Sequence, residues 1–357
     1  MTDRRLDDIT VSILKVDCII SLPMGGLIFI IFVFARYIMS LWFTKDSPEL
    51  QVKRSKSLLH PFIVNKYRGL TINPYQGCHH RCGYCYATYE WSPEFYDKIY
   101  SKSNAPEILE NQIKSWKSES IEPVMISSAT DPYQPAELRF ELTRKCVEIL
   151  QKYNIPYYVF TKSISISRDL ELHERYKDNC FIVWSITTSD ERLRRIIEPG
   201  TPPTYRMFSV IKKFSGSGIR CGVNIDPIMP ILTDSPDNLT SIIDSCQGAG
   251  VGYVLGAILR LRADIWERMK SILTILDIAN GTKEYERIFH FKEPLRSGSY
   301  NLEADNSYST KLLANLSREV SLRGMSFNFP DLIAANWVGN NSKLYKNKSQ
   351  LRLTDYI

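Results

Sequence analysis

Closely spaced cysteines are scarce in this sequence. Eight cysteines occur in 357 residues, and only three of them are near neighbours, which is unlike the spacing of a disulfide framework. Cys180 and Cys221 lie within or beside apolar runs, where a free thiol usually packs as a small hydrophobic side chain. The sequence therefore predicts free thiols and a reducing compartment.

A large net charge, internal repeats and long low-complexity tracts are also lacking. The formal net charge is +6, and the basic residues are interspersed with acidic ones. This balance permits an anionic partner without indicating one. Hydrophobic residues make up 44% of the chain and charged residues 24%, fractions typical of a globular protein with a large core rather than of a disordered chain.

One segment near the N-terminus has no charge at all. Cys18 to Ala35 would form a helix of about 27 Å, just long enough to span a bilayer, and the apolar run continues to Phe43 with one arginine in it. Lys and Arg are sparser before this segment than after it, which would leave the rest of the chain in the cytoplasm. Two interpretations stay open: a membrane anchor over 18–43, or a soluble cytoplasmic protein that starts at Met39.

The remainder of the chain has the pattern of an α/β protein. Short β-branched or aromatic runs alternate with longer amphipathic ones, as in repeated βα units around a parallel sheet. Right-handed crossovers repeated six times favour a partial (β/α)6 barrel of the TIM type. We expect strands at 70–73, 123–128, 157–161, 181–186, 220–225 and 253–259, and helices at 105–117, 141–153, 168–176, 204–214 and 237–249.

The chain divides into three parts on this pattern. Residues 1–51 form an N-terminal extension, 52–262 the barrel, and 263–357 a helical and irregular C-terminal extension. Two further helices are expected in the last part, at 263–279 and 308–320. We find no motif in this extension that predicts its role.

The three neighbouring cysteines follow the first expected strand, where a βα loop lies at the catalytic face of a barrel. Cys78, Cys82 and Cys85 are spaced by three and then two residues, so each thiolate can take one iron of a 4Fe-4S cluster and leave the fourth iron open. A zinc site with His79 or His80 as the fourth ligand is the alternative. A histidine directly beside a ligating cysteine is poorly placed to complete the same tetrahedron, so the spacing favours iron and sulfur.

Here the sequence resembles a known family. The C-x3-C-x2-C loop with Tyr84 before its last cysteine is similar to that of radical S-adenosylmethionine (SAM) enzymes. Four further motifs resemble the DNA-repair-photolyase-like subgroup, which is related to spore photoproduct lyase. They are Ser127 to Pro135, Phe160 to Ser163, Trp184 to Thr188 and Glu198 to Gly200.

The resemblance implies a radical SAM barrel that binds a 4Fe-4S cluster and SAM across its strand ends. It also implies reductive cleavage of SAM to a 5'-deoxyadenosyl radical that abstracts hydrogen, with a reductant protein such as ferredoxin or flavodoxin as partner. The residues expected at the cofactor are those of the motifs at the strand ends: Tyr84, Thr130, Asp131, Lys162 and Ser185. Glu198 with Arg206 is expected to close one rim of the site, and Asp226 to line it.

The substrate is not visible in the sequence. Spore photoproduct lyase has a hydrogen-donating cysteine where this chain has Ser128, so repair by that route is not expected. Nucleic acid stays open as a substrate through Arg192, Arg194 and Arg195, although such a cluster is usually a solvated helix face. Two other classes remain as alternatives: a zinc-dependent nucleic-acid-binding module and a membrane-tethered iron-sulfur electron carrier.

Overall fold

A computed structural model describes residues 48–64, 67–88, 94–116, 122–295 and 301–330. The described residues all lie within one compact unit, Asp46–Ile357. The segment 18–43, for which a membrane anchor and a protein start at Met39 are the two open interpretations, lies outside the described residues. Within the described ranges, no helix is both long and apolar enough to cross a membrane.

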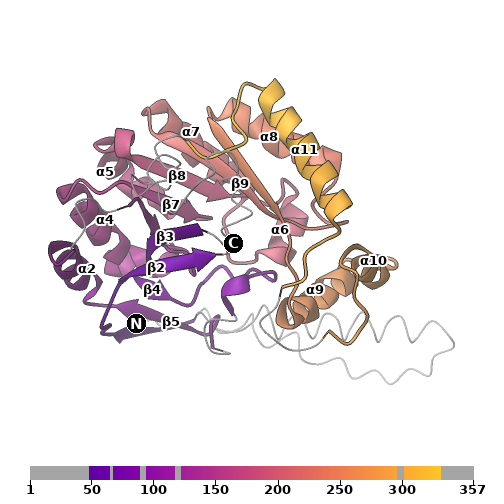
Figure 1. The fold of residues 1–357 in the computed structure, drawn as a ribbon, viewed down its shortest axis with the longest axis horizontal. Helices are drawn as coiled ribbons and strands as arrows, with labels where there is room; N and C mark the ends of the chain where they lie inside the picture. Colours follow the sequence, from indigo (N-terminus) through magenta and orange to yellow (C-terminus); the bar gives the residue numbers. More distant parts are fainter. Residues whose placement is uncertain (1–47, 65–66, 89–93, 117–121, 296–300, 331–357) are drawn as a thin grey trace, which may run out of the picture. The chain divides into compact units, whose positions relative to one another are not determined.

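The central feature is a seven-stranded sheet in the order β10-β9-β8-β7-β6-β3-β2 (Figure 1). Six neighbouring strands run parallel, and β2 pairs antiparallel with β3 at one edge. The sheet does not close on itself, so the expected partial barrel is confirmed. The strands are β2 (Leu59–Val64), β3 (Tyr67–Ile72), β6 (Val124–Ile126), β7 (Tyr157–Thr161), β8 (Cys180–Ser185), β9 (Arg220–Ile228) and β10 (Tyr253–Ile258).

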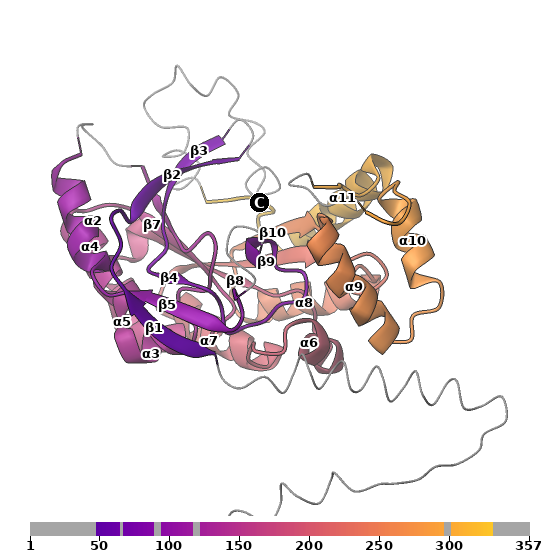
Figure 2. The same cartoon turned by 90° about the horizontal axis from the view of Figure 1, so that it is seen from below.

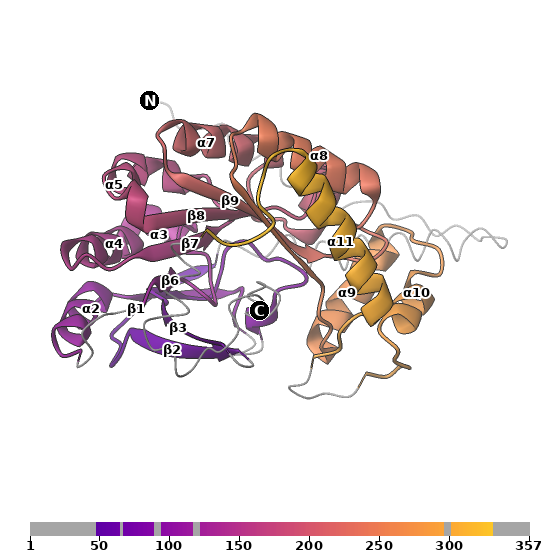
Figure 3. The same ribbon diagram turned by 45° about the horizontal axis from the view of Figure 1, so that its top comes forward.

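Helices connect the parallel strands and cover one face of the sheet (Figure 3). Each predicted helix is present, with bounds that differ by a few residues. Sequence analysis missed the short helices that follow β6 and β8. In this part of the chain the α-helices are α2 (Ala105–Lys114), α3 (Pro135–Phe140), α4 (Leu142–Lys152), α5 (Leu170–Glu174), α6 (Glu191–Ile197), α7 (Thr204–Gly216) and α8 (Pro236–Gly248).

The helix ends follow local chemistry. The Ser235 side chain accepts a hydrogen bond from the Asn238 amide at the start of α8, and Pro236 occupies the first turn, where its missing N–H costs nothing. Gly218 and Gly250 adopt positive φ shortly after α7 and α8, a conformation in which glycine commonly ends a helix.

A second, three-stranded sheet in the order β1-β5-β4 lies outside the barrel and was not predicted. Its strands are β1 (Glu49–Lys53), β4 (Tyr75–Gln76) and β5 (Lys98–Lys102). Lys and Glu residues interrupt the apolar pattern of these short strands, so the pattern does not predict them. The segments become strands because they pair with segments distant in the sequence.

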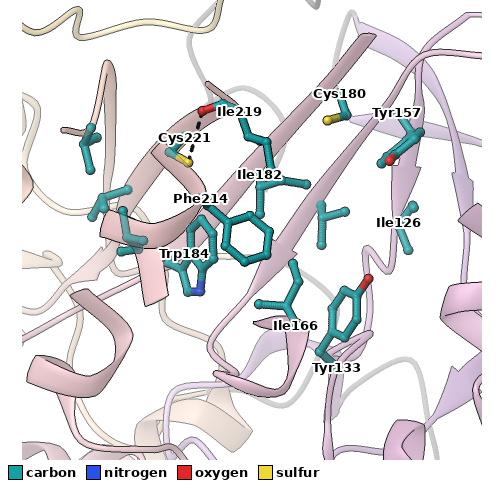
Figure 4. Close-up of a cluster of buried hydrophobic side chains, with 14 of the residues drawn as sticks. Ile126, Tyr133, Tyr157, Ile166, Cys180, Ile182, Trp184, Phe214, Ile219 and Cys221 are labelled. Atoms are coloured by element: carbon teal, nitrogen blue, oxygen red, sulfur yellow. Dashed lines mark hydrogen bonds between the residues drawn. The ribbon is translucent and has the colours of Figure 1, made fainter. Parts of the chain in front are cut away.

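The main core fills the space between sheet and helices. Alternate residues of β7, β8 and β9 face the covering helices, as Ile182 and Trp184 of β8 face Phe214 of α7 in Figure 4. The Trp184 and Phe214 rings meet edge to face with centroids 5.3 Å apart. The intervening residues face the opposite side of the sheet, where Tyr158, Phe181, Leu255 and Phe329 form a separate apolar cluster.

The C-terminal helices lie at the β10 end of the sheet (Figure 2). They are α9 (Ala263–Ile275), α10 (Gly281–Ile288) and α11 (Asn306–Leu322), of which α10 was not predicted. Helix α11 packs against α8 and β10, and α9 packs with Cys82 and Tyr84 in one apolar cluster. The C-terminal extension, in which the sequence showed no motif, therefore contacts the segment that carries the three cysteines.

Candidate functional site

The cysteine loop, defined here as Gly77 to Tyr86, follows β4 at the carboxyl end of the first barrel strand. Cys78 and Cys82 are buried, Cys85 is half-buried, and all three thiols are free. Burial raises the pKa of each thiol, to about 12 for Cys78, and each pair of thiols is close enough to shift a pKa between them. The three sulfurs therefore share one water-poor corner.

Gly77 allows the loop to lie against the start of β5. Its φ is +83°, and a Cβ there would lie 2.3 Å from the Lys98 carbonyl oxygen and 2.9 Å from that of Phe95. The next amide, of Cys78, donates to the Phe95 carbonyl at 3.2 Å. A side chain at position 77 would push the first cysteine away from its place.

Asp131 ties the cysteine loop to β7. Its carboxylate lies 2.9 Å from His80 Nε2 and accepts from the Lys162 amide at 2.7 Å and the Thr161 hydroxyl at 2.8 Å. Burial opposes ionisation, yet His80 and these donors hold the Asp131 pKa below its usual range. Because protein donors surround both oxygens, Asp131 positions the loop in this structure.

Thr130 also faces the loop rather than open space. Its hydroxyl donates to the Gly77 carbonyl at 2.5 Å and accepts from Gln134 Nε2 at 2.9 Å. The same Gln134 is fully buried and accepts from the His79 amide at 3.1 Å. Gln134 is a loop-positioning residue that sequence analysis did not single out, although it lies within a motif noted for another reason.

Lys162, at the end of β7, is paired with a buried carboxylate. Its Nζ lies 3.1 Å from Glu198 Oε1 and donates to the Ser185 carbonyl at 3.3 Å. Glu198 also accepts from the hydroxyls of Thr187, at 2.6 Å, and Tyr84. Burial lowers the Lys162 pKa, but Glu198 and Cys82 outweigh it and the net shift is upward.

Glu198 and Arg206, which were expected to close one rim of the site, do not pair with each other among the described residues. Glu198 is 1% exposed and forms its ion pair with Lys162, whereas Arg206 is exposed on α7. Sequence spacing had placed both on one loop. The buried lysine is the stronger partner because an unpaired carboxylate at that depth would be costly.

The barrel side of the sheet has a polar end and an apolar end. Ser185 and Asn224 are register partners on β8 and β9, and Asn224 donates to the Asp226 carboxylate at 3.3 Å. Burial raises the Asp226 pKa to about 6. The charges of Asp226 and Lys162 also interact, and Lys162 contacts the Ser185 carbonyl. These three strand-end residues therefore lie close together. The apolar cluster around Phe181 lies on the same face, toward the other end of the strands.

Two arginines at the start of α9 bind the second half of the cysteine loop. Arg268 donates to the carbonyls of Gly83 at 2.7 Å and Cys85 at 3.0 Å. Arg262 donates to the Tyr86 carbonyl at 2.7 Å. Nothing in the local sequence predicted these contacts, because the partners are about 180 positions apart.

Both histidines of the loop are engaged away from the thiols. His79 Nδ1 lies 2.9 Å from Gln134 Oε1, and His80 lies 3.1 Å from the Gly200 carbonyl through Nδ1 while its other nitrogen meets Asp131. These contacts argue against the alternative of a zinc site completed by His79 or His80. No three His, Cys, Asp or Glu side chains in the described ranges are spaced to hold a single metal ion. Thiolates that bind separate irons of one cluster lie farther apart than ligands of a single metal ion, so this spacing is compatible with a cluster.

Gly200 makes a second close backbone contact with the cysteine loop, in addition to the one at Gly77. Its amide donates to the His80 carbonyl at 3.0 Å, and a Cβ there would lie 2.2 Å from the His79 carbonyl oxygen. The Glu-Pro-Gly motif therefore contributes both the carboxylate that pairs with Lys162 and the backbone contact that holds the two histidines.

The three arginines proposed for nucleic acid do not form one surface. Arg194 is buried and donates to Glu191 at 2.7 Å and to the Thr201 carbonyl at 2.6 Å. Only Arg192 and Arg195 of the three are exposed. A further cavity beside α4 and α5 is lined by Arg144 and Arg168, whose guanidiniums already bind Asp169.

Comparison with known proteins places this site in a family. Residues 72–244 match the family model described as the radical SAM superfamily. An uncharacterized protein of Mycobacterium tuberculosis is 30% identical over 203 residues, covering 54% of this chain and 59% of the relative. An uncharacterized protein of Acidianus two-tailed virus is 28% identical over 227 residues, covering 57% and 72% respectively. The chain thus matches 59% of the length of its first curated relatives.

The fold resembles that of spore photoproduct lyase. A structure of that enzyme complexed with dinucleoside spore photoproduct superposes with a TM-score of 0.61 at 15% identity, covering 78% of this chain and 81% of the lyase. A variant of the lyase with bound AdoMet and the same dinucleoside superposes equally well, at 16% identity. With the matched region, the parallel sheet and the cysteine loop at its strand ends, residues 72–244 of this chain form a domain of the radical SAM superfamily.

Proposed function

We propose that the chain is a radical SAM enzyme whose Cys78, Cys82 and Cys85 hold a 4Fe-4S cluster. The observation that carries the proposal is the shared buried corner of three free thiols at the strand ends, with Lys162 and Glu198 beside it. A cluster bound there supplies the electron for reductive cleavage of SAM, and hence a 5'-deoxyadenosyl radical that removes hydrogen from a substrate.

The protein's own contribution is position and charge. Among the described residues, the Lys162 ammonium donates hydrogen bonds to two acceptors, which leaves its third N–H for the carboxylate of SAM. Ser185 and Asp226 extend the polar strand ends past Lys162, where the rest of the cofactor would lie. Tyr84, Thr130 and Asp131 support the cofactor indirectly, by fixing Glu198 and the cysteine loop.

The substrate class that we propose to test first is nucleic acid. The support is the likeness in fold to a lyase that has been solved with a dinucleoside. Ser128 stands at the position of the lyase's hydrogen donor, so a different reaction on such a substrate is expected. A ferredoxin or flavodoxin is the proposed electron donor.

The first experiment is anaerobic purification of the full chain with iron and sulfide assays. We expect about four irons and four sulfides per chain, and 5'-deoxyadenosine on addition of SAM and dithionite. Cys82→Ala should abolish both. Cys246→Ala, which removes a buried thiol from α8, is the matched control and should retain both.

Zinc without sulfide in the wild-type protein would instead support the zinc-binding alternative. A cluster that forms without any cleavage of SAM would support the electron carrier. Lys162→Ala separates these cases further, because an electron carrier has no need of that side chain.

A further inference from the structure

The first half of α9, with the residue before it, is bound to the cysteine loop through two arginines that share one carboxylate. Arg262 and Arg268 reach the loop carbonyls of Tyr86, Gly83 and Cys85. Asp264 joins the two arginines, at 3.2 Å from Arg262 and 3.3 Å from Arg268. We call these three residues, Arg262, Asp264 and Arg268, the α9 triad.

Both guanidiniums of the triad are withdrawn from water. The side chains of Arg262 and Arg268 are 7% and 11% exposed, whereas that of Asp264 is 37% exposed. Thr88 completes the group, because its hydroxyl lies 2.9 Å from the Cys85 carbonyl and 3.0 Å from Asp264. Charge-assisted bonds of this kind to backbone carbonyls are among the stronger hydrogen bonds in proteins.

The triad has a net charge of +1, because two guanidiniums face one carboxylate. Two nearby ion pairs, Lys162 with Glu198 and His80 with Asp131, add no net charge when both partners are charged. Arg268 lies beside the third cysteine, because it donates to the Cys85 carbonyl at 3.0 Å. The triad therefore adds positive charge on the α9 side of the loop.

We propose that the α9 triad positions the second half of the cysteine loop and raises the reduction potential of the cluster bound there. Reduction adds one negative charge to an iron-sulfur cluster, and a nearby buried cation stabilises that charge. This inference rests on the proposed function, and it gives the C-terminal extension a part in it.

The potential is tested by redox titration of the reconstituted full chain, followed by electron paramagnetic resonance. Arg268→Gln should shift the midpoint to more negative values, because a cation is lost. Asp264→Asn should shift it in the opposite direction, because a carboxylate is lost. Arg268→Lys should keep a midpoint near that of the wild type. Arg287→Gln, an exposed arginine on α10, is the control and should leave the midpoint unchanged.

The positioning role is tested on the metal-free chain by the rate at which iodoacetamide alkylates Cys85, read by mass spectrometry. Arg268→Gln should raise that rate about tenfold, since two charge-assisted hydrogen bonds no longer hold the loop closed. Arg268→Lys should also raise it, because a lysine cannot bind two carbonyls with a fixed fork. Arg287→Gln should react at the wild-type rate.

Opposite shifts in Arg268→Gln and Asp264→Asn would establish the electrostatic role, whereas shifts of the same sign, or none, would overturn it. Alkylation of Arg268→Gln at the wild-type rate would overturn the positioning role. Failure of the wild-type chain to bind four irons would count against the proposed function alone, because alkylation is measured without a cluster. Should Arg268→Gln not take up iron, its alkylation rate still decides the positioning role.

Discussion

At the residue scale, the site depends on carboxylates that are buried with their partners. Asp131 and Glu198 are 6% and 1% exposed, and each is surrounded by donors from several segments of the chain. A buried carboxylate is tolerated only where such donors replace water. These two residues therefore act as fixed points on which the cysteine loop and Lys162 are placed.

His173 is a buried base outside the candidate site. It is fully buried, and its ring nitrogens lie 2.9 Å and 3.0 Å from the hydroxyls of Tyr133 and Tyr157. Burial lowers its pKa from 6.5 to about 4, so the folded protein keeps this ring neutral at a pH where the unfolded chain protonates it.

The free energy of unfolding should therefore decrease as the pH is lowered, and His173 should account for part of the decrease. The stabilisation is present above pH 6.5 and is lost as the pH falls from there toward 4, because the unfolded chain binds the extra proton over that interval. At pH 5 the loss amounts to about 2 kcal/mol relative to pH 7.5. Urea unfolding of wild type and His173→Gln at both pH values measures it. Equal pH dependence in the two proteins would show that His173 does not titrate in this way.

At the element scale, the C-terminal helices are integral to the folded unit. Sequence periodicity predicted α9 and α11 but assigned them no role. In the structure Arg268 of α9 binds the cysteine loop, and Leu316 of α11 approaches Gly256 so closely that a Cβ on that glycine would lie 2.9 Å from Leu316 Cδ2. Gly256 thus provides the space in β10 against which α11 packs.

Truncating the buried side of α11 should destabilise the whole unit. Leu316 is 2% exposed, and Leu316→Ala should lower the free energy of unfolding by about 2–5 kcal/mol through lost apolar burial and the cavity left behind. Leu322 on the same helix is 71% exposed, and Leu322→Ala should change it by less than about 0.5 kcal/mol. Denaturant unfolding of both variants tests this, and a small effect at Leu316 would mean that α11 unfolds separately.

At the scale of the whole molecule, the cysteine loop is held by contacts with three distant segments of the chain. The end of β7 holds it through Asp131, the 198–200 motif through Gly200, and α9 through its arginines. Neighbouring ends of parallel strands explain the first two contacts, as expected for a barrel site. The third needs the chain to return past β10, and it brings the C-terminal extension to the site.

All of these contacts lie within the compact unit Asp46–Ile357. A chain that begins at Met39 should therefore unfold at the same urea concentration as the full chain, because the stabilising contacts described here are retained. Circular dichroism during urea titration of the two chains tests this prediction. A lower midpoint in the shorter chain would show that residues before Met39 contribute to stability. Sedimentation of each chain with membranes tests the anchor over 18–43 separately.

The amino-acid sequence by itself determined the six parallel strands and most of the helices between them, because hydrophobic periodicity is a local property. It also located the three cysteines and the residues at the strand ends, since these are motifs of adjacent positions. Only the tertiary structure decided the partners of those residues: Lys162 with Glu198, Asp131 with His80, and Arg268 with the loop carbonyls. Such pairings depend on which distant segments are buried together, and a buried charge takes whichever opposite charge or donor the fold brings to it.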